Sequence, residues 1–106
     1  MEKTITIDGK DIRFKSTGAT PLRYKQQFGK DFFAAIAKMS NGTKKISMAD
    51  IDLEVFYNIA WVFAKTADKT IPEPLEWFDT FDNFPIIEIV PDLQDMLMST
   101  MQTKKK

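Results

Sequence analysis

The first fifteen residues contain two short runs in which hydrophobic and polar side chains alternate, separated by the dipeptide Asp8-Gly9. Alternation with a period of two is typical of β-strands that have one apolar face. Asp-Gly is a strong signal for a hairpin turn. We therefore expect a β-hairpin over residues 4–15. Its apolar face must pack on helices or on another subunit, because an isolated hairpin is only marginally stable in water.

Two registers of this hairpin keep its four apolar residues on one face, because a shift of two residues leaves the facing unchanged. A two-residue loop places Ile5 opposite Ile12. A four-residue loop places Ile7 opposite Ile12 and Ile5 opposite Phe14. We favour the four-residue loop, because every apolar side chain then pairs with another across the strands.

Beyond the hairpin, hydrophobic residues recur every three to four positions, which is the spacing of amphipathic helices. Four such segments are expected, at about residues 20–39, 50–67, 74–81 and 85–98. The predicted fold class is mainly α (α+β): an N-terminal β-hairpin followed by about four helices, in a single small domain over residues 1–98. Residues 99–106 are expected to form a flexible basic tail.

The first and last of these helices each contain a residue that disfavours a helix. Gly29 weakens the middle of the first helix by about 1 kcal/mol relative to alanine, and a close helix crossing would explain its presence. This helix is expected to end at a left-handed cap formed by Asn41 or Gly42. Pro91 costs about 3 kcal/mol inside the last helix unless a kink absorbs it. A β-strand over residues 86–90 is therefore the competing prediction.

The second predicted helix is hydrophobic on nearly every side. Only Asp52, Glu54 and Asn58 interrupt the apolar residues that extend from Ile51 to Ala64. A helix of this kind lies at the centre of a core or is partly buried by another chain. Because a domain of 106 residues has little material with which to enclose a helix, this pattern predicts self-association.

The composition excludes several kinds of chemistry. The chain has no cysteine and no histidine, which excludes disulfides, thiolate nucleophiles and histidine-dependent triads and argues against zinc. Asp50, Asp52 and Glu54 have the spacing that begins a calcium loop, but its turn glycine and distal glutamate are missing, so helix capping is the preferred interpretation. We expect a protein that is not an enzyme, with no catalytic, cofactor-binding or metal-binding residues.

Charge is distributed unevenly, although the net charge is zero. Residues 1–49 contain ten basic and four acidic side chains, residues 50–103 contain two basic and eleven acidic ones, and three lysines at 104–106 restore the balance. Opposite charges on two halves favour head-to-tail association of copies. The alternative is two solvated faces of one domain. No nucleic-acid partner is expected, because the acidic half would repel phosphate.

Nothing in the sequence predicts a membrane partner. The longest apolar run, Ile59 to Ala64, has six residues, whereas a membrane span needs about 20. The N-terminus lacks the basic and apolar regions of a secretory signal. These features predict a soluble cytosolic protein.

Large side chains supply the candidate partner-binding residues. Tryptophan is enriched in binding hot spots, and methionine adapts to varied partner surfaces. Ordinary core packing is the alternative interpretation for these residues. The candidates are Tyr57, Trp61, Phe63, Trp77, Phe78 and Met96.

Five blocks follow one another along the chain: Thr4–Lys15, Thr17–Pro21, Arg23–Asp31, Leu53–Trp61 and Trp77–Phe81. In this order and spacing they closely resemble the phage tail assembly chaperones of long-tailed phages and prophages of Gram-positive bacteria. The resemblance covers most of the chain, from residue 2 to about residue 90. No single block is a chemical motif, so its specificity lies in the order and the spacing.

The resemblance implies a mostly helical, non-enzymatic protein that acts in the cytoplasm of the bacterial host and is absent from the mature virion. It implies binding to the phage tape measure protein, whose long helices are coated until tail tube protein polymerises around them. It also implies a homo-oligomer that forms spirals, and a longer form of the same protein made by programmed frameshifting. The lysines at 104–106 are compatible with an A-rich slippery codon run.

Two other classes of protein stay open at this stage. A structural phage tail or head–tail connector protein fits the size and would remain in purified particles. A small homo-oligomeric regulator or toxin-neutralising protein would bind DNA or one stoichiometric partner, although no recognition helix supports that interpretation.

Overall fold

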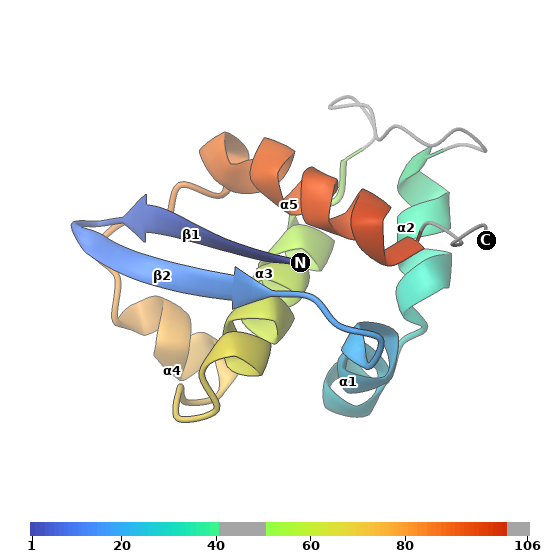
Figure 1. Cartoon of the computed structure of the whole chain (residues 1–106), viewed down its shortest axis with the longest axis horizontal. Coiled ribbons are helices and arrows are strands. Elements are labelled where there is room, and N and C mark those ends of the chain that lie inside the picture. Colours follow the sequence, from blue (N-terminus) through green and yellow to red (C-terminus); the bar gives the residue numbers. More distant parts are fainter. Residues whose placement is uncertain (41–50, 102–106) are drawn as a thin grey trace.

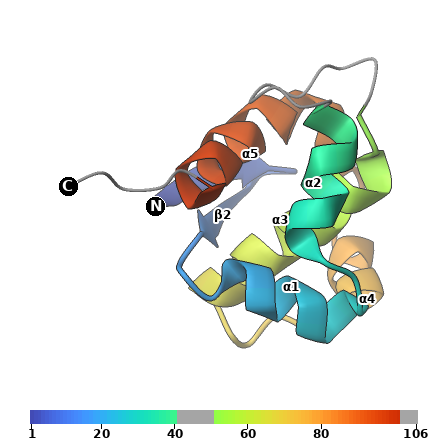
Figure 2. The same ribbon diagram turned by 90° about the vertical axis from the view of Figure 1, so that its right-hand side faces the viewer.

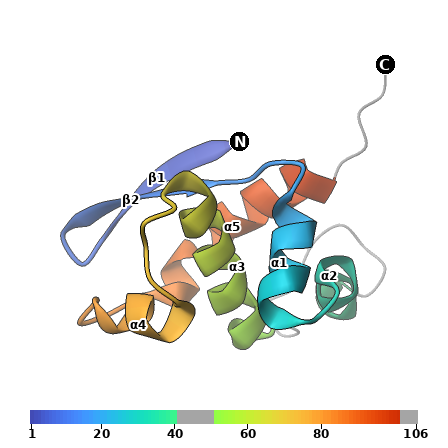
Figure 3. The same cartoon turned by 90° about the horizontal axis from the view of Figure 1, so that it is seen from below.

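The computed structural model describes residues 1–40 and 51–101 of the chain. Within these ranges an N-terminal antiparallel hairpin is followed by five helices in one small domain, which confirms the mainly α (α+β) class. The hairpin lies across one side of the helices, and the third helix runs through the centre (Figures 1 and 3). The elements are β1 (Glu2–Ile7), β2 (Lys10–Lys15), α1 (Thr20–Phe28), α2 (Phe32–Ser40), α3 (Leu53–Ala67), α4 (Pro74–Asp79) and α5 (Ile86–Met101).

The hairpin forms where the sequence predicts it, but the preferred register is wrong. Ile5 lies opposite Ile12, and the loop contains only Asp8 and Gly9. Both loop residues have positive φ, 55° and 77°, which is the requirement of a type I′ turn. The backbone twist of this turn matches the twist of the strands, whereas a longer loop gains only side-chain pairing. Turn geometry therefore decides the register.

This register places a lysine near each end of the hairpin's inner face. Lys10 lies opposite Ile7, and its ammonium donates to the carbonyl of Thr80, 3.0 Å away, in the turn that follows α4. Lys3 reaches α5, where its Nζ lies 3.2 Å from Asp92 Oδ1 and 3.1 Å from Asp95 Oδ2. The aliphatic parts of the Lys3 and Lys10 side chains cover the edge of the hairpin, while their ammonium groups stay near water.

The single helix predicted over residues 20–39 is wrong, because the chain breaks it into α1 and α2. Gly29 has φ 72° and its N–H donates to the carbonyl of Lys25 over 2.8 Å, which is a left-handed C-cap. A Cβ atom added to Gly29 would meet nothing within 4 Å, so the predicted close crossing is wrong as well. Asp31 then accepts a hydrogen bond from the N–H of Phe33 and starts α2. Figure 2 shows the two helices running in different directions from this corner.

Helix α3 is enclosed by the chain itself. Its six consecutive residues Ile59–Ala64 are buried, and β2, α1 and α5 pack around it. It starts at Leu53, where the Asp52 carboxylate caps it by accepting from the N–H of Glu54 over 3.1 Å. The apolar surplus from which we predicted self-association is therefore already covered along this stretch.

Helix α5 runs from residue 86 to residue 101, so the competing strand over residues 86–90 is wrong. Pro91 lies inside the helix, where its ring replaces the N–H that would bond to the carbonyl of Ile87. Both side chains are exposed, so the missing bond lies on the outer side, where water can hydrate the carbonyl. The helix also includes residues 99–101, which we expected in the tail.

Other sequence expectations lie outside the described residues. These are the left-handed cap at Asn41 or Gly42, the possible role of Asp50 in a carboxylate cluster, and the tail beyond residue 101 with its three lysines.

The core is one cluster of buried side chains, and all seven elements of the described ranges contribute to it. Members at 1% exposure or less come from both strands and from most helices, which shows that hairpin and helices share one interior. One buried residue from each element, in chain order, is Ile7, Phe14, Tyr24, Ile36, Phe63, Trp77 and Leu93.

Candidate protein-binding groove

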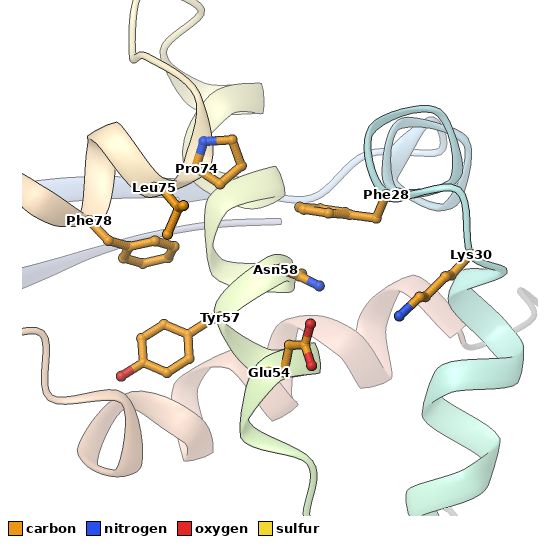
Figure 4. Close-up of a pocket in the computed structure, with 8 residues that line it drawn as sticks. All are labelled: Phe28, Lys30, Glu54, Tyr57, Asn58, Pro74, Leu75 and Phe78. Atoms are coloured by element: carbon orange, nitrogen blue, oxygen red, sulfur yellow. The ribbon is translucent and has the colours of Figure 1, made fainter.

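An open groove with a volume of about 670 Å³ lies between α4 and the corner that joins α1 to α2. Helix α3 forms its floor, and most of its lining is apolar (Figure 4). We call it the α3–α4 groove. Its lining residues are Phe28, Lys30, Glu54, Tyr57, Asn58, Pro74, Leu75 and Phe78.

The floor of the groove is a face of α3 that the domain leaves partly open. Glu54, Tyr57 and Asn58 are spaced three and four residues apart, so they lie on one helical face. Tyr57 and Asn58 are half-buried, whereas the following residues Ile59–Ala64 are buried. A largely buried helix thus presents a narrow, fixed strip to the outside.

The wall formed by α4 depends on a buried tryptophan. Pro74 opens the helix as predicted, and Trp77, 5% exposed, anchors it in the core. Leu75 precedes Trp77 by two positions, about 200° around the helix, so it points away from the core. It is 80% exposed, the highest value among the large hydrophobic side chains in the described ranges.

The loop before α4 is held by α3, which keeps the wall in place. The indole N–H of Trp61 donates to the carbonyl of Pro72 over 2.9 Å. The ammonium of Lys65 donates to the carbonyls of Lys69 and Ile71 over 3.0 and 2.7 Å. Three hydrogen bonds from α3 thus fix the loop.

Aromatic packing joins the floor to this wall. The Tyr57 and Phe78 rings meet edge to face with centroids 5.1 Å apart, and Phe84 contacts both at 6.0 and 4.9 Å. Each such pair contributes about 0.5–1.5 kcal/mol beyond its buried area. These contacts hold α4 against the floor of the groove.

Polar groups of both signs border the groove. Lys30 and Glu54 stand at the end near the α1–α2 corner (Figure 4). Gln27 Nε2 donates to Glu73 Oε1 over 3.1 Å and links α1 to the residue that precedes α4. An apolar centre inside a polar rim is the usual anatomy of a protein-binding surface.

The six candidate partner-binding residues separate into two groups. Tyr57 and Phe78 line the groove and are partly exposed. The other four have no more than 5% of their surface exposed and lie where the core-packing interpretation places them. This second group is Trp61, Phe63, Trp77 and Met96.

Sequence reasoning missed three apolar residues of the groove: Phe28, Pro74 and Leu75. In the sequence, Phe28 falls on the apolar stripe of the helix predicted over residues 20–39, and Leu75 is one of several apolar residues in the helix predicted over residues 74–81. A usable signal was available for Leu75, because it and Trp77 cannot share one face of a helix. Only one of them can point into the core.

No group of three or more acidic side chains within residues 1–40 and 51–101 could hold a metal ion. In the same ranges no helix has the length and hydrophobicity needed to cross a membrane.

The groove is suited to bind a helix that carries a stripe of apolar side chains. Its volume falls within the usual range of ligand sites, and an apolar floor with polar edges is typical of helix-in-groove recognition. No protein-family model, curated protein or solved structure matches the chain. The groove and the five sequence blocks are therefore the two observations that bear on function.

Proposed function

We propose that the protein is a non-enzymatic phage tail assembly chaperone that binds the tape measure protein and keeps it soluble during tail morphogenesis. It acts in the cytoplasm of the bacterial host and leaves before the virion is complete. The observation that carries the proposal is the α3–α4 groove, an exposed apolar surface on an otherwise well-packed domain. The five sequence blocks supply the identity of the client.

The groove suits the client because a tape measure protein consists of long amphipathic helices that would otherwise aggregate. Apolar side chains at positions i, i+3, i+4 and i+7 of such a helix can contact Leu75 and Phe78 on one wall and Phe28 on the other. Lys30 and Glu54 stay hydrated at the rim. Many small chaperone copies, each covering a short segment, would shield a long client.

The charge distribution supports self-association of these copies. Acidic side chains gather on and around α4, whereas basic ones lie on α1 and α2, on the other side of the α3–α4 groove. Contact between the acidic side of one copy and the basic side of the next can repeat without closing, so it builds an open array such as a spiral. A longer frameshifted form would enter the same array through its shared domain. The exposed charges are Glu73, Glu76, Asp79 and Asp82 on the acidic side and Lys25, Lys30 and Lys38 on the basic side.

Co-expression with the tape measure protein of the same phage tests the proposal. We expect the wild-type protein to raise the soluble fraction of the client and to co-purify with it in many copies. Leu75→Gln should weaken each contact about 5- to 30-fold, because a mostly exposed leucine that becomes buried contributes about 1–2 kcal/mol. The matched control is Leu22→Gln, which replaces an exposed leucine of α1, 59% accessible, outside the groove lining.

The outcomes separate the alternatives. If the client stays insoluble with the wild-type protein, the chaperone function is refuted, and detection of the protein in purified particles would identify a structural tail or head–tail connector component. If Leu75→Gln and Leu22→Gln both retain the client as the wild type does, the chaperone function stands but the groove is not its binding surface.

A further inference from the structure

A second open pocket, with a volume of about 350 Å³, lies between α1 and α3. We call it the α1–α3 pocket. Among the described residues its lining contains two cationic side chains and no carboxylate, in contrast to the mainly apolar lining of the α3–α4 groove. The lining residues are Arg23, Gln26, Gln27, Trp61, Val62 and Lys65.

The pocket continues the floor of the groove along α3. The α3 residues that line the two spaces occupy positions i, i+3, i+4, i+7, i+8 and i+11, so they form one face of the helix. In chain order they are Glu54, Tyr57 and Asn58 in the groove and Trp61, Val62 and Lys65 in the pocket. The hydrogen bond from Gln27 to Glu73 marks the boundary, because Gln27 lines the pocket and Glu73 precedes a groove residue. A helix that lies along the groove can therefore extend over the pocket.

Arg23 supplies donors that have no partner among the described residues. Its side chain is half-buried, and it forms no hydrogen bond or ion pair within residues 1–40 and 51–101. The Nε atom is buried, so a ligand does not reach it, whereas neither terminal nitrogen is a buried atom without a partner. The terminal nitrogens are thus the donors that the pocket offers. Their two parallel N–H groups match the two oxygens of a carboxylate.

Lys65 adds a second positive charge in a fixed position. Its ammonium donates to the carbonyls of Lys69 and Ile71 over 3.0 and 2.7 Å, and it lies 5.8 Å from the centre of the Trp61 ring. These two hydrogen bonds use two of its three N–H groups and leave one for a ligand.

Two carboxylates near the pocket are already paired. Glu73 Oε1 accepts from Gln27 over 3.1 Å. Hydrogen bonds from the hydroxyl and the N–H of Thr70, 2.6 and 3.0 Å long, lower the pKa of Asp68, and Lys65 adds a smaller effect in the same direction. Neither carboxylate lines the pocket, so its two positive charges favour an anionic group from a binding partner.

We propose that the α1–α3 pocket binds one aspartate or glutamate side chain of the helix that occupies the α3–α4 groove. The carboxylate accepts from the terminal nitrogens of Arg23 and lies beside the Lys65 ammonium. Eight residues of α3 separate Tyr57 from Lys65, which is about 12 Å or two helical turns. The acidic residue of the bound helix is therefore about two turns from the apolar side chain that contacts Tyr57.

The pocket also gives the groove a direction. Its opposite end has Lys30 and Glu54, whose charges balance, whereas this end has an unbalanced positive charge. A helix with an acidic residue on one side of its apolar stripe can satisfy the pocket in only one orientation. This inference rests on the proposed helix-binding function and adds a rule for which helices bind best.

Synthetic amphipathic helical peptides are the probe, used with the full-length protein. All carry the same central leucine stripe. A single test position is moved through the two turns on either side of the stripe, with glutamate in one series and glutamine in the other. Dissociation constants are measured by fluorescence anisotropy. On one side of the stripe we expect a position at which the glutamate peptide binds about five- to tenfold more tightly, which is more than an exposed ion pair gives and less than a fully buried charged hydrogen bond.

Variants of Arg23 locate the effect. Arg23→Gln should abolish the glutamate preference while leaving the affinity for the glutamine peptide unchanged. Arg23→Lys keeps the charge without the paired donors, so it should retain only part of the preference. Arg23→Glu should instead favour a peptide with lysine at the same position. The matched control is Lys25→Gln, which removes an exposed charge of α1 that does not line the pocket and should keep the preference.

Three results would overturn the pocket. One is equal binding of the glutamate and glutamine peptides at every position in the wild-type protein. Another is a glutamate preference that survives Arg23→Gln. The third is an equal loss of preference in Arg23→Gln and Lys25→Gln, which would assign it to the overall charge of α1. If no peptide binds at all, groove and pocket both fail, whereas binding without preference removes the pocket alone.

Discussion

Replacing Gly29 with alanine distinguishes the observed corner between α1 and α2 from the continuous helix that the sequence pattern predicts. In a continuous helix, alanine would raise the free energy of unfolding by about 1 kcal/mol. In the structure Gly29 has φ 72°, a left-handed conformation that costs an L-residue about 1–2 kcal/mol. No atom lies within 4 Å of the added Cβ, so no clash adds to this cost. Allowing for the stiffer unfolded chain, about 0.4–1 kcal/mol, we expect a net loss of roughly 1 kcal/mol.

Urea unfolding followed by circular dichroism measures this change. With a slope of about 1–3 kcal/mol per molar urea, the midpoint should fall by several tenths of a molar. Gly18→Ala is the matched control, because Gly18 also has free space around it but no left-handed φ, so its midpoint should stay level or rise. A Gly29→Ala variant that is more stable than the wild type would refute the corner. A continuous helix through Gly29 would also move Phe28 and Lys30 away from the groove that they line.

Two other predictions concern stability. Asp52→Ala should lower the free energy of unfolding by about 1 kcal/mol, because the N-cap bond to the N–H of Glu54 is lost; an equally stable variant in urea titrations would contradict this cap. The hydrogen bond to Asp95 holds the pKa of Lys3 above its ordinary value of 10.5. The stabilisation is therefore fully present below pH 10.5 and is lost as the pH rises through the folded-state pKa. Lys3→Met should be less stable than the wild type near neutral pH, by no more than about 1 kcal/mol for this partly exposed pair. The difference should narrow in strongly alkaline buffer, and a constant difference across this range would contradict the assignment.

The strands were predictable because their alternation and the Asp8-Gly9 turn point to the same hairpin. The register was not predictable from side-chain pairing. Both registers put Ile5, Ile7 and Ile12 on one face, so burial does not discriminate between them. The backbone conformation of the turn determines the register, since both turn residues adopt positive φ. In this hairpin the conformational preference of the turn outweighs apolar pairing across the strands.

The corner at Gly29 escaped prediction because hydrophobic periodicity continues through it. Tyr24, Phe28, Phe32 and Ile36 are each four positions apart, as in one helix, and all of them pack on the core cluster. A glycine in this context is compatible with a straight helix or with a left-handed cap. The three-dimensional core decides between them, because α1 packs on α3 while α2 leaves the Gly29 corner in a different direction (Figure 2).

The candidate site was harder to predict than the fold, because residue type says little about exposure. Trp61 and Phe63 resemble interface residues by composition, yet the hairpin and helices bury them. Leu75 resembles a core residue, yet Trp77 occupies the inward side of the same short helix. The exposure of a side chain depends on which of the neighbouring residues occupies the core. The sequence around a single residue does not determine this, because it depends on how the whole domain packs.

The packing of the hairpin has a consequence for synthesis on the ribosome. The strands are made first, but the partners of their inner face are made late, since β2 packs on α3 and Lys3 binds Asp92 and Asp95 of α5. At roughly 5–20 residues per second, the nascent strands wait for seconds with Ile7 and Phe14 uncovered. Final folding of the domain must then wait until α5 has left the ribosome, and a ribosome paused before α5 would hold an emerged hairpin with an exposed apolar face.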